Sequence, residues 1–345
     1  MAKKKGLLDR LRKGTVFCAE GYIFELERRG YVQAGAYVPE VALEFPDVVY
    51  QLHREFVRAG SDVTLALTYY AHREKLKAVG RENDLEKMNR AALKIASDVA
   101  KESGTLLAGN ICNSGAYDPA DAVASGKEVK QQYSEQLDWA ADAGVDFVLA
   151  ETIEYLGEAV IALEAIKDHK LPAVINFAAN LEKSKDGYDW IEACKILEEK
   201  GADVVGFNCS RGPDSMLPLL KKLRKAVSIP IAALPVAYRT TTKQPSFQSL
   251  ENSGGGSAYT TGLDEFMCTR NEMAEFAKQA EEIGVKFIGI CCGAGPHHVR
   301  AMVEALGRET AASKYSPDMS KHYLLGSKKY AKKHEAKHLD HFSDH

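Results

Sequence analysis

The amino-acid sequence predicts an α/β fold, a (β/α)8 TIM barrel followed by a polar helical extension at its C-terminal end. Short apolar runs rich in Val and Ile alternate eight times with longer amphipathic segments. Strands of this composition are buried on both faces, which implies a parallel sheet connected by helices. Eight such units within 345 residues match the count and length of a closed barrel.

Each strand expected in the first half of the chain is followed by a helical pattern. The first is expected at 15–21, and the helical pattern after it ends near Gly60. The second and third are expected at 61–70 and 105–112, and apolar residues recur at i, i+3 and i+4 behind both. The fourth is expected at 147–152, again ahead of an amphipathic run.

The second half of the chain repeats this pattern, with strands expected at 171–178, 204–210, 229–238 and 287–293. Glycines directly follow three of the helical runs, where a C′ glycine ends a helix: Gly144, Gly201 and Gly284. A doubly wound open sheet is the alternative fold. That fold uses a glycine-rich phosphate loop after its first strand, and AEGYIFE does not supply one.

Composition excludes several classes of protein. A formal net charge of −3 offers no footprint for nucleic acid or for an anionic membrane. The basic segment MAKKKGLLDRLRKG is not followed by an apolar signal-peptide region, and no run is long enough to span a membrane. Seven cysteines, an odd number without a secretion signal, point to reduced thiols in a soluble, cytoplasmic protein. Four stand singly and are expected to be small buried hydrophobes: Cys18, Cys112, Cys194 and Cys268.

The remaining three cysteines lie where two expected strands end, Cys209 on the sixth and the pair Cys291–Cys292 on the eighth. Catalytic residues of such barrels come from these strand ends. Three thiolates leave one tetrahedral position of zinc open, as in a catalytic site. Adjacent strand residues face opposite ways, so both members of the pair reach one metal only if the strand breaks, which Gly293 permits. Two buried strand-end cysteines, or a redox pair, are the alternatives.

Two polar segments have less specific patterns. NSGGGS at 252–257 follows the seventh strand and is either a mobile active-site loop or a plain linker. The tail contains SKKYAKKHEAKHLDHF, which is expected to form an exposed helix. His334 and His338 are spaced i, i+4 within it, but a solvated or partner-contacting helix is favoured over a metal site.

GFNCS and, 82 residues later (291 − 209), GICCGAGPHHVRAM resemble the zinc signature of the homocysteine S-methyltransferase family. Members of that family take three zinc thiolates from a Gly-x-Asn-Cys strand and a Gly-Gly-Cys-Cys-Gly strand, and Ile290 replaces one glycine here. GYIFELERRGYVQAGAYVPE and LTYYAHREKL resemble its betaine-dependent members. The resemblance implies a catalytic barrel over 1–306, Zn²⁺ at the three cysteines, and a C-terminal extension over 307–345 that serves as an oligomerisation arm of a homo-oligomer.

The implied reaction moves a methyl group from a methylated onium donor, betaine-like or sulfonium, to a zinc-activated thiol such as homocysteine, giving methionine. Zinc makes a thiolate from a thiol that is otherwise mostly protonated at neutral pH. Aromatic faces attract an onium cation, and four tyrosines fall at strand ends or in early loops, although each could equally serve in packing: Tyr22, Tyr37, Tyr69 and Tyr70.

The sequence departs from the family where the acceptor binds. The Asp-Gly-Gly of the family reads Ala19, Glu20 and Gly21, and its Gln-Thr on the second strand reads Leu65 and Ala66. Its Glu-Tyr on the fourth strand reads Glu151 and Thr152, so that carboxylate is kept. The substrate contacts expected from this comparison are Glu20, Gly21, Tyr37, Tyr70 and Glu151.

These substitutions leave three alternatives. Either homocysteine is held differently, or another thiol is the acceptor, or the donor has changed as well. A zinc-binding barrel with a binding or regulatory role is the non-catalytic reading. A redox protein that uses the vicinal cysteines is disfavoured, because the chain has no Cys-x-x-Cys motif.

Overall fold

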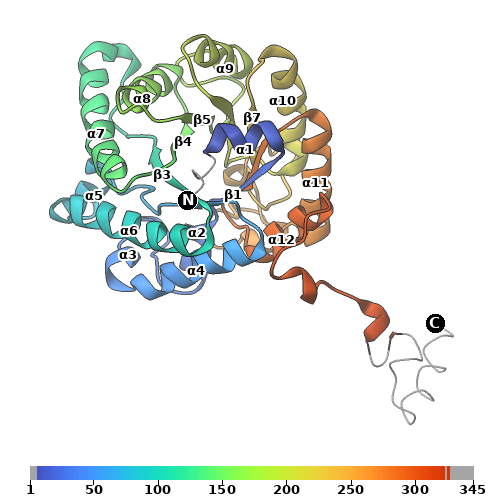
Figure 1. The fold of residues 1–345 in the computed structure, drawn as a ribbon. Coiled ribbons are helices and arrows are strands. Elements are labelled where there is room, and N and C mark those ends of the chain that lie inside the picture. Colours follow the sequence, from blue (N-terminus) through green and yellow to red (C-terminus); the bar gives the residue numbers. More distant parts are fainter. Residues whose placement is uncertain (1–5, 323–324, 327–345) are drawn as a thin grey trace.

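Eight parallel strands close into a barrel in chain order, β1-β2-β3-β4-β5-β6-β7-β8, in the computed structural model (Figure 1). The structure describes residues 6–322 and 325–326. The strands are β1 Val16–Ala19, β2 Val63–Leu65, β3 Leu106–Cys112, β4 Phe147–Ile153, β5 Ala173–Phe177, β6 Val204–Asn208, β7 Ile231–Leu234 and β8 Phe287–Ile290. The predicted (β/α)8 barrel is confirmed, and the open doubly wound sheet is excluded.

The ring closes where β1 pairs with β8. Val16 pairs with Phe287 and Ala19 with Ile290, and every neighbouring pair in the ring is parallel. Parallel pairing places all eight carboxyl ends on one rim. Residues that follow different strands, far apart in the sequence, therefore meet at that rim.

The helices surround the barrel as an outer layer (Figure 1). They are α1 Leu7–Lys13, α2 Tyr22–Arg28, α3 Val41–Glu44, α4 Pro46–Ala59, α5 Arg73–Ala78, α6 Leu85–Ser103, α7 Ala122–Asp142, α8 Leu156–Asp168, α9 Trp190–Glu199, α10 Pro213–Ala226, α11 Arg270–Ile283 and α12 Pro296–Ala305. Gly144, Gly201 and Gly284 have φ values of 74°, 94° and 94°. The predicted C′ glycines are thus in the left-handed conformation that ends a helix.

The first helix is an addition to the eightfold repeat. Leu7 and Leu11 of α1 are buried and belong to the main hydrophobic core, and Arg10 donates to the carbonyl of Gly104. The helix lies across the front of the barrel (Figure 1), and its contact with Gly104, just before β3, identifies this as the end where the strands begin. Burial of these two leucines removes apolar surface from water.

The chain leaves the barrel after α12 (Figure 1). Within the described part of the extension only short 3₁₀ turns occur, at Ser313–Tyr315 and Met319–Lys321. The helix expected within 327–342, with His334 and His338, lies outside the described residues. The boundary at 306 and the role of 307–345 stay predictions.

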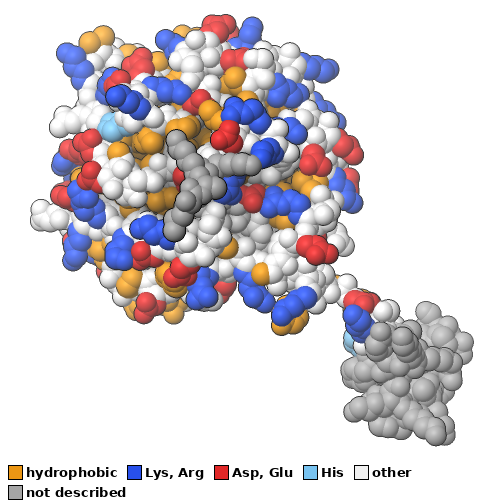
Figure 2. Space-filling view, viewed as in Figure 1, with side chains coloured by type: hydrophobic (Ala, Val, Ile, Leu, Met, Phe, Trp, Pro, Cys, Tyr) orange, Lys and Arg blue, Asp and Glu red, His pale blue; other side chains and the backbone are white. Residues whose placement is uncertain are grey.

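Basic and acidic side chains are interspersed on the face shown in Figure 2. Within the described ranges, no helix combines the length and apolar character that a membrane span requires. The lone cysteines Cys18, Cys112, Cys194 and Cys268 are buried free thiols, as small core residues should be.

Candidate active site

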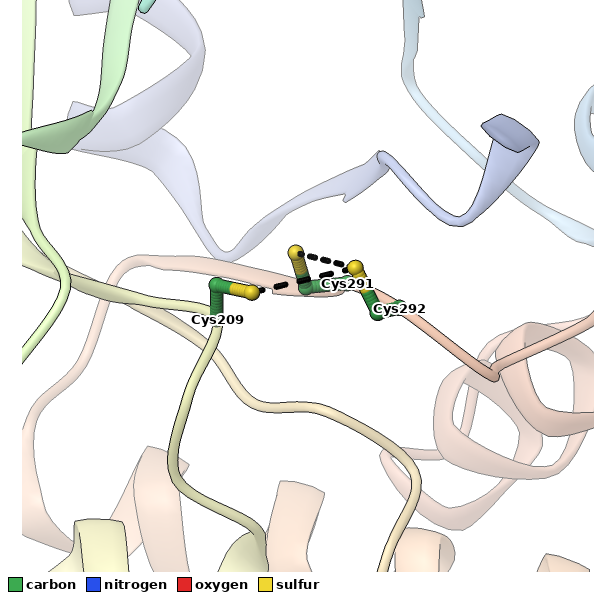
Figure 3. A group of neighbouring side chains, drawn as sticks. All are labelled: Cys209, Cys291 and Cys292. Atoms are coloured by element: carbon green, nitrogen blue, oxygen red, sulfur yellow. Dashed lines mark hydrogen bonds between the residues drawn. The ribbon is translucent and has the colours of Figure 1, made fainter. Parts of the chain in front are cut away.

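Three thiols converge at the rim where the strands end (Figure 3). Sγ of Cys292 lies 3.7 Å from Sγ of Cys209 and 3.9 Å from Sγ of Cys291, and all three sulfurs are within 4.8 Å of one another. Two thiolates at about 2.3 Å from one tetrahedral zinc are separated by roughly 3.8 Å. Two of the three sulfur separations therefore match a thiolate zinc site, and the third, between Cys209 and Cys291, is no longer than 4.8 Å.

Backbone geometry brings Cys209 into this cluster. The strand β6 ends at Asn208, and Cys209 and Ser210 then adopt φ values of 55° and 53°, in the left-handed region. Such a conformation is uncommon for residues with a Cβ and concentrates at functional sites. The Cys209 amide still donates to the carbonyl of Leu234 on β7, so the turn is anchored to the neighbouring strand.

The pair Cys291–Cys292 lies past the end of its strand. The ladder of β8 stops at Ile290, two residues earlier than a break at Gly293 would require, and the cysteines stand in the turn that follows. The Cys291 amide donates to the carbonyl of Pro235, and the Cys292 carbonyl accepts from Ala237. Because neither cysteine is held in the pleat, both sulfurs can face the same point.

Gly293 completes this turn with φ 81°. A Cβ at that position would lie 2.3 Å from Cζ of Tyr238, so the Tyr238 ring occupies the space of a side chain. The Arg28 guanidinium donates to the Gly293 carbonyl at 3.1 Å and to the Tyr238 hydroxyl at 2.9 Å. Only glycine fits this conformation and this close contact.

Hydrogen bonds among the three thiols favour ionisation of one of them, Cys209. Hydrogen bonds from Cys291 and Cys292 lower the pKa of the Cys209 thiol to about 5. The pKa values of Cys291 and Cys292 are raised well above the usual range, chiefly by their hydrogen bonds to Cys209. A sulfur cluster that already favours an anion at one member is suited to a cationic metal.

Glu151, on β4, lies close to Cys291 in a network of amides. Its Oε1 accepts from Asn110 Nδ2 at 2.5 Å, and its Oε2 accepts from Asn208 Nδ2 at 2.9 Å. Asn208 also donates to Thr152 Oγ1 and accepts from the Thr152 amide. Asn208 therefore ties the carboxylate to the end of β6, directly before Cys209.

Glu20 has no such network. Its side chain is 9% exposed, and neither carboxylate oxygen has a hydrogen-bond partner. Glu20, Glu151 and Cys291 place ligand atoms within 4.8 Å of one another. Burial, and then the neighbouring Glu151, raise the pKa of Glu20 well above its usual range, while burial and Cys291 raise that of Glu151 to about 8. The two carboxyl groups thus face each other at the cavity wall, where a bound cation would stabilise their charged forms.

One cavity contains every site residue expected from the sequence. It encloses about 770 Å³ of empty space, including its open mouth, and its walls include the eight predicted residues: Glu20, Gly21, Tyr37, Tyr70, Glu151, Cys209, Cys291 and Cys292. A Cβ at Gly21 would lie 2.4 Å from the carbonyl oxygen of Ala294, so glycine lets the first loop approach the thiol turn. Whether these residues bind substrate or metal stays a prediction.

Sequence reasoning missed part of the wall. Phe247, Gln248 and Tyr259 line the cavity, and they flank NSGGGS in the long loop after β7. The segment 252–257 is thus the tip of a cavity-lining loop, closed by a bridge between Glu251 and Ser257. Its position after a barrel strand was the available signal, but no pattern showed which of its aromatic rings turn inward.

Comparison with known proteins gives consistent matches. The family model described as homocysteine S-methyltransferase matches residues 21–306. The chain is 35% identical over 335 residues to mouse betaine–homocysteine S-methyltransferase 1, covering 94% of this chain and 80% of that protein. It is 33% identical to S-methylmethionine–homocysteine S-methyltransferase BHMT2 of Pongo abelii, covering 94% and 87%.

Solved structures match in fold. The metallated form of the homocysteine methyltransferase MmuM from Escherichia coli superposes with a TM-score of 0.67 and 19% identity, covering 85% of this chain and 98% of that one. At this level of identity the match supports the barrel architecture alone.

Proposed function

Because the chain belongs to the homocysteine S-methyltransferase family, we propose that it is a zinc-dependent S-methyltransferase that moves a methyl group from an onium donor to a thiol such as homocysteine, giving methionine. The observation that carries this proposal is the convergence of Cys209, Cys291 and Cys292 inside the cavity. A zinc ion held by these three sulfurs would keep a fourth position for the acceptor sulfur.

The donor set fits zinc, since soft thiolates at these separations are its preferred ligands. Zinc, when bound, would keep the acceptor thiol ionised at neutral pH. In the reaction the acceptor sulfur forms a bond to the methyl carbon while the bond from that carbon to nitrogen or sulfur of the donor breaks. The leaving amine or sulfide keeps the bonding electron pair, and the thiol proton goes to solvent.

The remaining walls bind and orient the two substrates. Glu20 and Glu151 lie beside Cys291 and would face the ammonium group of an amino-acid thiol, with Gly21 leaving room beside them. Tyr37 and Tyr70 would contact the onium centre through their ring faces. Holding both reactants in line within the cavity supplies the rate acceleration, and no general base is needed.

Metal analysis tests the zinc site directly. The purified wild-type chain should contain about one zinc ion, and Cys209→Ala should lose most of it because two thiolates bind zinc far more weakly. Cys194→Ala, which removes a buried thiol on α9 outside the cavity, is the matched control and should keep the metal. A wild-type chain without zinc would exclude the proposal.

A second candidate is a zinc-binding barrel with another thiol acceptor or with a non-catalytic binding role. It is favoured by the apolar Leu65 and Ala66 and by Thr152 in the cavity wall, and by Ala19 in β1 beside it. Screening onium donors against homocysteine and other thiols separates the candidates. Turnover that is lost in Cys292→Ala supports an enzyme and excludes the non-catalytic role.

We also propose that the protein is cytoplasmic and forms a homo-oligomer. A cytoplasmic homo-oligomer is consistent with reduced thiols and with an extension that leaves the barrel. Sedimentation equilibrium should give a multiple of 37.8 kDa for the full chain. A mass of one chain at micromolar concentration contradicts the oligomerisation arm.

A further inference from the structure

The histidine pair that follows the thiol motif, His297 and His298, lies in the first turn of α12. The two residues differ in their surroundings. His297 is exposed, whereas His298 is 1% exposed and lies under the His297 ring at a centroid distance of 3.9 Å. A buried imidazole group needs partners for its ring nitrogens, so the contacts of His298 show what it does.

Both ring nitrogens of His298 are bonded to backbone groups. The Gly295 amide donates to Nδ1 at 3.1 Å, so this nitrogen carries no proton. Nε2 then carries it and donates to the carbonyl of Cys268 at 2.9 Å. Burial, and then the neighbouring His297, lower the pKa of His298 to about 4, which keeps the ring neutral. Because both nitrogens are engaged, His298 does not supply a fourth ligand to the metal site.

These two bonds join segments that both reach the candidate active site. Gly295 is the N-cap of α12 and ends the turn that carries the cysteine pair. Cys268 lies at the end of the long loop after β7, whose rings Phe247 and Tyr259 line the cavity. His298 therefore connects the thiol turn to the loop that forms part of the cavity wall.

Backbone hydrogen bonds complete a closed circuit through the same two segments. The Cys292 carbonyl accepts from the Ala237 amide at 3.1 Å, and the Ala237 carbonyl accepts from the Cys268 amide at 2.8 Å. His298 then links the Cys268 carbonyl to the Gly295 amide, and the turn leads back to Cys292. The other links are backbone groups, so His298 is the member of this circuit that a substitution can remove.

We infer that His298 is a positioning residue that fixes the turn carrying Cys291 and Cys292, so that both sulfurs face Cys209. The inference rests on the proposed zinc site and adds a residue from outside the cavity wall to those that shape the site. The β8 ladder ends at Ile290, so strand pairing does not extend to this turn. Without the two ring bonds, the sulfurs should move away from positions that suit one ion.

Three substitutions separate the two bonds. His298→Ala removes both of them. His298→Asn keeps an oxygen at the place of Nδ1, where it can accept from Gly295, but loses the donor to Cys268. His298→Gln keeps an amide nitrogen at the place of Nε2, where it can donate to Cys268, but loses the acceptor for Gly295.

Zinc affinity of the full chain, measured by competition with a chromogenic chelator, should fall at least about tenfold in His298→Ala, the effect of losing one or two hydrogen bonds. His298→Asn and His298→Gln should each bind zinc more tightly than His298→Ala. Asp189→Ala is the matched control, because it also removes two side-chain bonds at the start of a helix, those to the Ile191 and Glu192 amides of α9. It should bind zinc as the wild type does.

Cobalt substitution adds a spectroscopic readout that a loss of stability alone does not move. The visible absorption of Co²⁺ bound to thiolates depends on the arrangement of its ligands. The spectrum should therefore change in His298→Ala and stay unchanged in Asp189→Ala.

Wild-type zinc affinity together with a wild-type cobalt spectrum in His298→Ala overturns the inference. Asn and Gln variants that bind zinc no better than His298→Ala overturn it as well. If His298→Ala does not fold, the other two variants decide, because each lacks one bond and should bind zinc severalfold more weakly than the wild type, whereas equal affinity refutes the positioning role. A wild-type chain that binds no zinc overturns the proposed function, and the positioning role with it.

Discussion

Replacement of Gly293 by alanine should destabilise the folded protein and distort the turn that carries Cys291 and Cys292. An L-residue in the left-handed conformation costs about 1–2 kcal/mol, and φ at Gly293 is 81°. The new Cβ would also lie 2.3 Å from Cζ of Tyr238, an overlap that a packed core relieves at a cost of about 1–3 kcal/mol. The two costs together predict that the free energy of unfolding falls by roughly 2–5 kcal/mol.

The control separates the two terms. Gly144 has φ 74° and no atom within 4 Å of an added Cβ, so Gly144→Ala carries the conformational cost alone. Urea denaturation of the zinc-free proteins should therefore show a loss of about 1–2 kcal/mol for Gly144→Ala and a larger loss for Gly293→Ala. Only Gly293→Ala should weaken zinc binding, measured by competition with a chromogenic chelator, because only that turn carries cysteines.

A second substitution, at Tyr238, tests whether contact with this ring causes the loss of zinc affinity. Tyr238→Ala removes the ring that an alanine at 293 would meet, so the double variant should regain part of the zinc affinity that Gly293→Ala loses. Equal zinc affinity and equal stability in Gly293→Ala and Gly144→Ala would refute the reasoning. That result would mean that the turn adjusts freely and does not position the two thiols.

Two further perturbations follow from buried polar groups. Asn208→Ala removes hydrogen bonds to both Glu151 and Thr152 and leaves a buried carboxyl group short of a donor. Urea denaturation should therefore show that the free energy of unfolding falls by about 2–4 kcal/mol. A decrease below about 0.5 kcal/mol would contradict the role of this network. Burial lowers the pKa of His53 to about 3, and neither ring nitrogen has a hydrogen-bond partner where the ring packs against Tyr22. The unfolded chain then binds more protons below its usual pKa of about 6.5, so stability is complete above that pH and falls by up to about 1.4 kcal/mol per unit as the pH drops towards 3. His53→Phe should flatten this part of the stability–pH curve in denaturation series, and an unchanged slope would refute the assignment.

The barrel was predictable because its signal is local and repeated. Each strand reads as a short apolar run and each helix as an amphipathic period, so all eight units could be placed from the sequence. The predicted strands differ from the observed ones mainly in where they end. The second strand was expected at 61–70 but ends at Leu65, since the residues beyond it turn into the rim loop rather than continuing the ladder.

The thiol site was predictable in composition but not in conformation. Cys209, Cys291 and Cys292 could be grouped because parallel strands end on one rim, and the resemblance of their motifs named the metal. The left-handed turn at Cys209 carries no pattern of its own, since most residues with positive φ in this protein are glycines and a cysteine is not expected there. The same holds for Asn208, whose contact with Glu151 joins residues 57 apart in the chain.

The sequence by itself determined the closed barrel, the three metal-binding candidates and the substituted acceptor positions, because each is expressed by neighbouring residues or by strand order. Only the tertiary structure decided which side chains share the cavity with the thiols. It left Glu20 buried without a partner, brought Phe247 and Tyr259 onto the wall, and put no cationic side chain on the described wall. These outcomes depend on how loops from separate strands pack over one rim, which no local pattern encodes.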